Sequence, residues 1–322
     1  MSKSLFFRKI EANIGTPTAV QFDGAPGWFF YGLPLTSLQH MAFGAGQTDK
    51  LALTRCFGEA AEILSITRRE GDQFFDGEGI IDGNRDMISA KDVTSTATSK
   101  PEDPGNEGAA AGETFTQAWH SAAWEIVERD AISAWWLGQL QPFAISDDWI
   151  SSTGLDQLMF QARAGRTSNR QLRLIALQPA SGATVVVAVT RNQLGHSPVL
   201  GFGAGPDIKV SAAKAISEAL QMELSLAIAL QSARTNERQK PIVARMRALE
   251  RSHSERITPT KFATLNENLF PESRTSYAKL VGADAYFVDL SRQDIGVPVA
   301  RVIAPSMASA RQLKHQTMPA PL

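Results

Sequence analysis

Three segments of the chain have a strong helical pattern, and each carries paired polar groups on one side. Apolar residues recur every three or four positions from about Asp49 to Leu64, from about Thr116 to Leu140 and from about Ser211 to Ser232. This spacing is typical of amphipathic helices. In each segment, two acids or an acid and an amide stand three positions apart, on one side of the helix. The pairs are Glu59 with Glu62, Glu125 with Glu128, and Glu218 with Gln221.

Strand-like segments lie between and around these helices. Residues 13–46 are expected to form short extended pieces, because Gly and Pro break an otherwise apolar run. A hairpin and three further strands are predicted from β-branched and apolar stretches. They are Arg173–Leu177 with Ala183–Thr190, then Pro198–Phe202, Ala285–Leu290 and Val297–Ile303. Because the elements do not alternate as regular βαβ units, the sequence predicts one α/β or α+β domain over residues 1–322, with mixed sheets, packed helices and no internal repeat of fixed period.

Polar segments mark the predicted helix ends, a loop and a tail. Asp49 and Thr116 are placed to cap the first two helices. Residues 89–112 are rich in Ser, Thr, Gly and Pro, which predicts a long flexible loop. Residues 234–261 carry eight Lys or Arg and three Glu. We interpret this stretch as a solvated helix with linkers, or as a docking surface for an acidic partner. A proline-containing tail covers residues 315–322.

Composition excludes several classes of protein. The net charge of −1 argues against a nucleic-acid binder, because such binding depends on excess positive charge. With Cys56 as the single cysteine, neither an intrachain disulfide nor a four-cysteine zinc site can form, and a buried packing role is expected for it. The longest apolar run, Ala183–Val189, is far too short to span a membrane. The N-terminus lacks a secretory signal pattern, so a cytoplasmic location is expected.

The paired acids are the strongest chemical signal in the sequence. Two carboxylates three residues apart repel each other, and a divalent cation reverses this cost, because carboxylate oxygens are usual ligands of Mg²⁺ next to nucleotide phosphates. The alternative is a set of solvated helix faces. Apolar residues flank each pair, for example Trp124 and Ile126 beside Glu125. Carboxylates in such surroundings are rarely left without a partner.

Other motifs are absent or incomplete. Gly201-Phe-Gly-Ala-Gly205 resembles a dinucleotide-binding loop, but the third glycine of that fingerprint falls at Pro206. No Gly-x-x-x-x-Gly-Lys-Ser/Thr phosphate loop is present, and the five histidines lack metal-ligand spacing.

Five motifs, in order over about residues 45–310, resemble the YcaO family. Ala122–Ile132 looks like its Glu-x-x-Glu-Arg-Asp-Ala helix, and Glu107–Gly112 like its Asn-Gly-x-Ala-x-Gly loop. Ala52–Glu62 resembles its first glutamate helix. Gly201–Asp207 with Ala212–Gln221 resembles its Gly-x-Gly-x-x-x-Asp segment and Glu-x-x-Gln helix. Asp294–Pro305 resembles its late strand.

The resemblance implies ATP-dependent activation of a peptide backbone amide, with a site for ATP and Mg²⁺ between glutamate-bearing helices. A Cys, Ser or Thr side chain of a precursor peptide would add to the preceding carbonyl, ATP would phosphorylate the oxyanion, and loss of phosphate would give an azoline. By this analogy four glutamates bind metal and further residues contact the nucleotide. The metal ligands are Glu59, Glu62, Glu125 and Glu128; the nucleotide contacts also include Glu107, Arg129, Lys214, Glu218 and Gln221.

The chain also departs from the family pattern. Ile63, Glu107 and Lys214 stand where the family has Arg, Asn and Arg, and Pro305-Ser306 replaces its late Pro-Gly. These departures keep open a non-catalytic adaptor. Another alternative is a YcaO enzyme that forms thioamides or amidines.

The resemblance implies partners and a role for the C-terminus. The expected partners are the precursor peptide and an E1-like, ocin-ThiF-type leader-binding subunit, in a hetero-oligomer without nucleic acid or membrane. Whether a flavin-dependent azoline dehydrogenase then oxidises the ring stays open. Azoline-forming members tend to end in a proline-rich tail whose carboxylate enters the active site. Pro319, Pro321 and Leu322 resemble that ending and are the predicted catalytic residues, with a frayed terminus as the alternative.

Overall fold

The structure is a computed structural model that describes residues 13–38, 40–97, 103–166, 169–179, 181–232, 240, 243–244, 247, 257–265 and 274–307. It divides into two compact units. Unit 1 comprises Met1–Val20, Phe29–Arg129 and Pro271–Arg311, and unit 2 comprises Gln21–Trp28, Asp130–Phe270 and Gln312–Leu322. The described strands form three antiparallel sheets, so the predicted mixed α/β class is confirmed.

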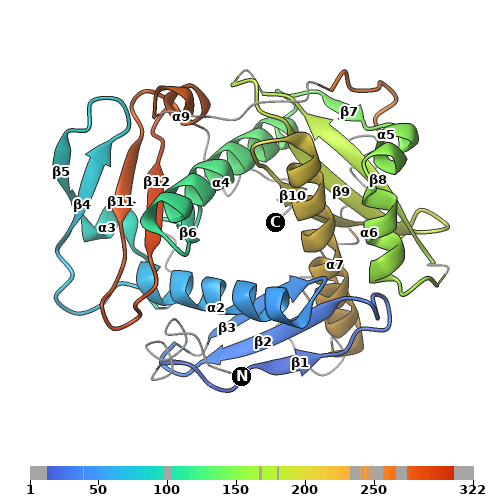
Figure 1. Cartoon of the computed structure of the whole chain (residues 1–322), viewed down its shortest axis with the longest axis horizontal. Coiled ribbons are helices and arrows are strands. Elements are labelled where there is room, and N and C mark those ends of the chain that lie inside the picture. Colours follow the sequence, from blue (N-terminus) through green and yellow to red (C-terminus); the bar gives the residue numbers. More distant parts are fainter. Residues whose placement is uncertain are drawn as a thin grey trace. The chain divides into compact units, whose positions relative to one another are not determined.

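Unit 1 begins with a three-stranded sheet covered by a helix. The strands are β1 (Thr18–Val20), β2 (Phe29–Leu35) and β3 (His40–Gly46), in the order β1-β2-β3. Helix α2 (Asp49–Ile66) packs on β2 and β3 (Figure 1). Its buried face includes Cys56, Ala60 and Leu64, which share one hydrophobic core with Leu33. Burial of this apolar stripe holds the helix on the sheet.

A five-stranded sheet completes unit 1. Its order is β5-β4-β11-β12-β6. The elements are β4 (Phe74–Gly79), β5 (Arg85–Ser89), α3 (Ala90–Val93), β6 (Ala109–Ala111), α9 (Arg274–Val281), β11 (Tyr286–Asp289) and β12 (Val299–Ile303). Helix α2 also contacts β6 and β12. Helix α4 (Phe115–Trp136) starts in unit 1, where Trp119 stacks on Phe287 of β11 with ring centroids 5.0 Å apart, and its last residues belong to unit 2.

Unit 2 is built on a four-stranded sheet in the order β10-β9-β8-β7. The strands are β7 (Pro142–Ala144), β8 (Arg170–Leu177), β9 (Val185–Asn192) and β10 (Val199–Gly203). The helices are α5 (Asp147–Ser152), α6 (Leu155–Ala162) and α7 (Ile208–Ser232). Helix α7 packs on β10 and β9 (Figure 1), and β9 is buried over most of its length. The predicted hairpin is confirmed as β8 and β9.

Several predicted boundaries are wrong. The first helix is capped by the Thr48 hydroxyl, which accepts the Leu51 N–H, and not by Asp49. Thr114, rather than Thr116, caps α4 by accepting the Gln117 N–H. Residues 89–112 are not one flexible loop, because α3 and β6 lie within them. Most of residues 234–261 and the tail at 315–322 lie outside the described residues.

No helix in the described part of the chain is both long and apolar enough to cross a membrane.

Candidate functional site

The first pair of predicted site carboxylates lies on α2, on the side that meets the sheet edge. Glu59 is partly buried, and its Oε2 accepts a hydrogen bond from the Phe43 N–H of β3 at 3.1 Å. Glu62 lies one turn further and is also partly buried. Ile63, which stands where the resembled family has arginine, packs against the core of unit 1. The helix therefore presents two carboxylates without a neighbouring cation at position 63.

The second pair lies on α4 with an arginine beside it. Nε of Arg129 is 3.7 Å from Oε1 of Glu125, and its Nη2 is 3.8 Å from Oε1 of Glu128. The Glu125 and Glu128 side chains are 26% and 12% exposed. These carboxylates are enclosed by protein on most sides but still reach solvent, so a ligand can reach them.

Electrostatic coupling joins the two pairs. Burial raises the pKa of Glu62 well above its usual value, and the charges of Glu125 and Glu59 raise it further. Burial likewise raises the pKa of Glu125 to about 7, opposed first by Arg129, while Glu128 and Glu107 add repulsion. Burial raises the pKa of Glu59 to about 7, although the hydrogen bond that its carboxylate accepts from the Phe43 N–H acts to lower this pKa. The carboxylates of α2 and α4 therefore form one cluster, in which each negative charge disfavours the ionised form of the neighbouring carboxyl groups.

We refer to this set as the glutamate cluster. It consists of Glu59, Glu62, Glu107, Glu125, Glu128, Arg129 and Arg301.

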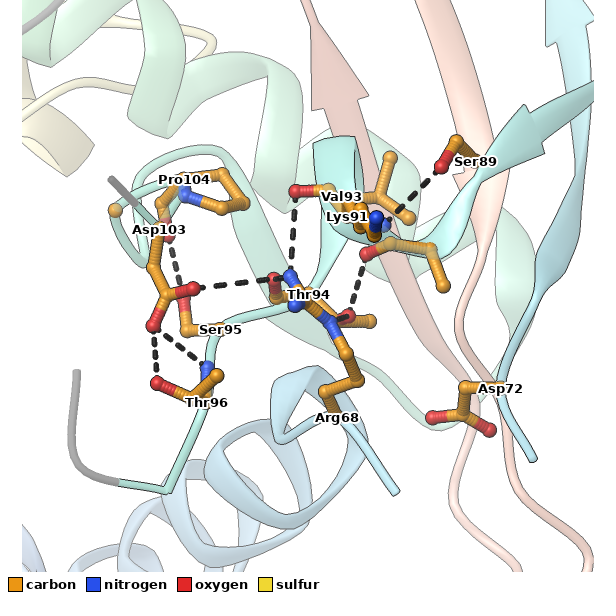
Figure 2. A network of polar contacts seen from close by, with 12 residues as sticks. Arg68, Asp72, Ser89, Lys91, Val93, Thr94, Ser95, Thr96, Asp103 and Pro104 are labelled. Atoms are coloured by element: carbon orange, nitrogen blue, oxygen red, sulfur yellow. Dashed lines mark hydrogen bonds and ion pairs between the residues drawn. The ribbon is translucent and has the colours of Figure 1, made fainter. Parts of the chain in front are cut away.

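The loop that brings Glu107 to the cluster is held by a buried polar network (Figure 2). Arg68 donates to the carbonyl and hydroxyl oxygens of Thr94 at 2.7 and 3.1 Å, and its guanidinium lies 3.7 Å from Asp103. Asp103, 6% exposed, accepts hydrogen bonds from the N–H and hydroxyl of Thr96. Through these contacts, Thr94 and Thr96 at one end of the segment are linked to Asp103 at its other end.

Gly108 determines the backbone conformation at the end of this loop. Its φ is +71°, and a Cβ there would lie 2.5 Å from Cδ1 of Ile126 and 2.6 Å from the Val302 carbonyl. Only glycine fits such a left-handed residue between α4 and β12. The residue before it, Glu107, is thereby set beside α4.

Arg301 belongs to the cluster although it was not among the predicted site residues. It is 6% exposed on β12, and it donates to the carbonyls of Val93 and Gly105 at 2.9 and 2.7 Å. Its charge lowers the pKa of both Glu62 and Glu125. The signal in the sequence was a single arginine inside the apolar strand Val299–Ile303, because charged residues are rarely buried unless they are paired.

The third pair of predicted residues lies in unit 2, in a repeat of the first arrangement. The tetrapeptide Phe-Gly-Ala-Gly occurs at 43–46 and again at 202–205, each time before a long helix. Oε2 of Glu218 accepts the Phe202 N–H at 2.6 Å, and Glu218 follows Phe202 by the same 16 residues that separate Glu59 from Phe43. Gln221 then takes the place of Glu62. The prediction of no internal repeat of fixed period did not include this two-copy motif.

Glycines explain why the two copies have the same geometry. A Cβ at Gly44 would lie 2.2 Å from the Ala52 carbonyl of α2, and one at Gly203 would lie 2.1 Å from the Ser211 carbonyl of α7. Both carbonyls are eight residues after their glycine. Without a Cβ the helix can touch the strand, and this contact brings the helix glutamate within reach of the strand N–H.

The other predicted nucleotide contacts are placed as follows. Lys214 is exposed on α7, and its Nζ donates to the Ala204 carbonyl at 2.8 Å. Gln221 is partly buried one turn after Glu218. The predicted catalytic residues Pro319, Pro321 and Leu322 lie outside the described residues.

The donor set of unit 1 fits Mg²⁺ that is shared with phosphates. No group of three or more His, Cys, Asp or Glu within the described residues forms a closed metal site; the carboxylates come in pairs. Mg²⁺ keeps several waters and commonly uses one or two carboxylates together with substrate phosphates. A cation at the cluster also offsets the repulsion that raises the pKa of Glu62. The residues present therefore suit an ATP–Mg²⁺ site better than an all-protein cage.

Solved structures share this fold. A heterocyclase in complex with substrate and cofactor has a TM-score of 0.71 at 17% identity; the match covers 94% of this chain and 52% of that one. YcaO from Methanopyrus kandleri, bound with AMPPCP and Mg²⁺, also gives 0.71 and 17%, over 98% and 91% of the two chains. The E. coli microcin synthetase McbBCD complex with pro-MccB17 bound gives 0.65 and 14%, over 91% and 88%. At these identities the likeness establishes the fold alone.

The sequence of one protein family matches most of the chain. No curated protein matches the chain. The family described as YcaO cyclodehydratase, ATP- and Mg²⁺-binding, matches residues 93–308, which is more than half of the 322 residues. The chain therefore belongs to the YcaO family of ATP- and Mg²⁺-binding cyclodehydratases.

Proposed function

We propose that this chain is the ATP-dependent cyclodehydratase subunit of a peptide synthetase, and that it converts Cys, Ser or Thr of a ribosomal precursor peptide to an azoline. The glutamate cluster carries the proposal, because its four paired carboxylates repel one another unless a cation lies among them. Family membership supplies the reaction class. In this proposal units 1 and 2 together make up one YcaO domain.

The cluster residues divide into two roles. Glu59, Glu62, Glu125 and Glu128 hold Mg²⁺, and Arg129 offers a guanidinium to a phosphate oxygen. When bound, ATP supplies the phosphoryl group that makes the former carbonyl oxygen of the peptide a leaving group, and Mg²⁺ neutralises its charge. Partial exposure of Glu125 and Arg129 leaves the route to these groups open.

Further contacts to the nucleotide are assigned to four residues outside the metal ligands. Glu107 reaches the cluster on its fixed loop. Glu218 accepts a hydrogen bond from the Phe202 N–H through Oε2, which orients its carboxylate. Lys214 and Gln221 lie one turn before and one turn after Glu218 on α7.

The last predicted site residues and the partners complete the proposal. Pro319, Pro321 and Leu322 are assigned to the reaction because they resemble the proline-rich ending of azoline-forming YcaO proteins. The precursor peptide is delivered by an E1-like leader-binding subunit in a hetero-oligomer, and a flavin-dependent dehydrogenase acts on the ring where an azole is the final product.

Mass spectrometry of a precursor peptide tests the reaction. With ATP, Mg²⁺ and the leader-binding subunit, each ring formed lowers the peptide mass by one water. A gain equal to the difference between sulfur and oxygen would instead identify a thioamide-forming enzyme. Absence of any nucleotide affinity, alone or with the partner subunit, would identify an adaptor and overturn the proposal.

A double substitution tests the metal ligands. Glu125→Gln with Glu128→Gln should abolish turnover and Mg²⁺-dependent nucleotide binding, because amides are weaker Mg²⁺ ligands than carboxylates. The control is Asp147→Asn with Asp148→Asn, which removes two exposed carboxylates from α5 in unit 2 and should leave turnover unchanged. Equal activity of the two double variants would exclude the assignment.

A further inference from the structure

Each Phe-Gly-Ala-Gly copy makes a further contact, between its alanine and a cation on the following helix. Nη1 of Arg55 on α2 donates to the Ala45 carbonyl of β3 at 2.8 Å. Nζ of Lys214 on α7 donates to the Ala204 carbonyl at the same distance. In both copies the cation follows its alanine by ten residues and precedes the helix glutamate by four. The repeated arrangement therefore includes a cation as well as a glutamate.

In the first copy, both contacts are made to one edge of a sheet. Strand β3 stands at the end of the order β1-β2-β3 in the described sheet. The outer side of an edge strand presents N–H and C=O groups that need partners from outside the sheet. The Phe43 N–H and the Ala45 carbonyl are two residues apart, so they point to the same side of the strand. Glu59 accepts from the first group, and Arg55 donates to the second.

One side of α2 supplies these two partners. Arg55 and Glu59 stand four positions apart, and such positions are neighbours on a helix surface. A single contact with β3 would let the helix turn or slide about that point. Two contacts, one helical turn apart, restrict both movements. Arg55 and Glu59 together therefore form a two-point clamp, which fixes the rotation of α2 relative to the edge of β3.

The position of the Glu59 carboxylate is important if this group binds Mg²⁺. Mg²⁺ requires near-octahedral geometry with ligand distances of about 2.0–2.1 Å, so a small displacement of a ligand weakens binding. A group that orients a metal ligand without touching the metal typically changes the affinity by about 10- to 100-fold. The Phe43 N–H is such a group for Glu59, and Arg55 holds the strand that carries this N–H.

We propose that Arg55 is a positioning residue, which holds the Ala45 carbonyl and thereby keeps the Phe43 N–H where it orients the Glu59 carboxylate. This proposal deepens the proposed function and rests on it for the ligand that Glu59 binds. The second copy indicates which substitution Arg55 tolerates. Because Lys214 makes the corresponding contact, the clamp needs a donor of sufficient reach and not a guanidinium group, whereas a two-pronged contact to phosphate would need arginine.

Two substitutions in the full chain test the clamp. Arg55→Met removes the donor and keeps a long side chain, and Arg55→Lys keeps a donor. Hydrogen exchange of the Phe43 N–H in the metal-free chain should be about tenfold faster in Arg55→Met and within about twofold of the parent in Arg55→Lys. The dissociation constant for AMPPCP with Mg²⁺, measured where every variant is folded, should rise about tenfold in Arg55→Met and stay within about twofold in Arg55→Lys.

The matched control is Lys50→Met, which removes an exposed cation from the first turn of the same helix and should change neither quantity. Parental exchange of the Phe43 N–H in Arg55→Met, or equal impairment by Arg55→Met and Arg55→Lys, overturns the proposal. Faster exchange with parental nucleotide affinity also overturns it, because the contact would then serve the fold alone. A parent chain without nucleotide affinity would instead refute the proposed function, and exchange of the Phe43 N–H would still decide whether Arg55 positions Glu59.

Discussion

The contact between Gly44 and α2 gives the sharpest prediction about unit 1. In Gly44→Ala the new Cβ would lie 2.2 Å from the Ala52 carbonyl and 2.4 Å from the Cys56 nitrogen. Ordinary contact begins near 3.4 Å, so α2 must move away by about 1 Å. Overpacking of this kind costs about 1–3 kcal/mol. The same movement lengthens the 3.1 Å bond between Glu59 and the Phe43 N–H, so the affinity for ATP–Mg²⁺ should fall together with stability.

Gly58→Ala on the same helix is the matched control. A Cβ at Gly58 would meet nothing within 4 Å, and alanine stabilises a helix interior by roughly 0.5–1 kcal/mol relative to glycine. The two Gly→Ala variants should therefore change the free energy of unfolding in opposite directions, and they should differ by roughly 1.5–4 kcal/mol.

Cys56 provides the assay, because it is the single cysteine and lies buried between α2 and the sheet. Burial, and secondarily the charge of Glu59, raises the pKa of its thiol to about 12. Alkylation should therefore require α2 to open from the sheet. In native buffer Gly44→Ala should be labelled about 5- to 150-fold faster than the parent chain, and Gly58→Ala no faster. Unchanged labelling and unchanged nucleotide affinity in Gly44→Ala would refute the reasoning.

Three further predictions concern protonation, the buried arginines and the tail. Since the pKa of Glu59 rises from 4.5 to about 7 on folding, the metal-free folded chain retains a proton there that the unfolded chain has lost. Its stability relative to Glu59→Gln should therefore fall between pH 4.5 and 8 in urea titrations, and a rise would contradict this. Glu223→Gln removes the carboxylate shared by Arg163 and Arg170, and it should cost about 3–5 kcal/mol in the same titrations; a cost below about 1 kcal/mol would show that the pairing adds little. Deleting Pro319–Leu322 should abolish ring formation, as measured by peptide mass, without changing the thermal unfolding midpoint, and undiminished activity would remove the tail from the mechanism.

Strong periodicity made the long elements predictable. The buried residues of α2 include Ala52, Cys56, Ala60 and Leu64, which the apolar spacing had marked. The helix cap was misassigned because Thr48 and Asp49 are adjacent and both can cap; the extended backbone at Thr48 decides between them, with φ −129° and ψ 150°. Spacing alone does not reveal that backbone angle.

Short elements within residues 89–112 could not be predicted, because distant partners create them. Strand β6 consists of three alanines, which carry no strand signal. It exists because Ala109 and Ala111 pair with Arg301 and Val299 of β12. Helix α3 has four residues, too few for a periodic pattern.

The candidate site was predictable as pairs but not as a cluster. The spacing of three residues placed Glu125 and Glu128 on one side of a helix. The coupling of Glu125 to Glu62 depends on where α2 and α4 lie in unit 1, which no local pattern specifies. Arg301 was missed for the same reason, since its partners are carbonyls more than 190 residues earlier in the chain.

Glu62 and Gln221 give the two Phe-Gly-Ala-Gly copies different responses to a cation. In the first copy the charge of Glu59 raises the pKa of Glu62, whereas the amide of Gln221 adds no charge beside Glu218. A cation bound at the first copy removes repulsion, and its binding free energy adds to the free energy that keeps α2 on β3. We therefore expect local opening of unit 1 to depend more strongly than that of unit 2 on the concentration of Mg²⁺–nucleotide. In the proposed reaction, the bound nucleotide therefore also stabilises the folded form of its own binding site.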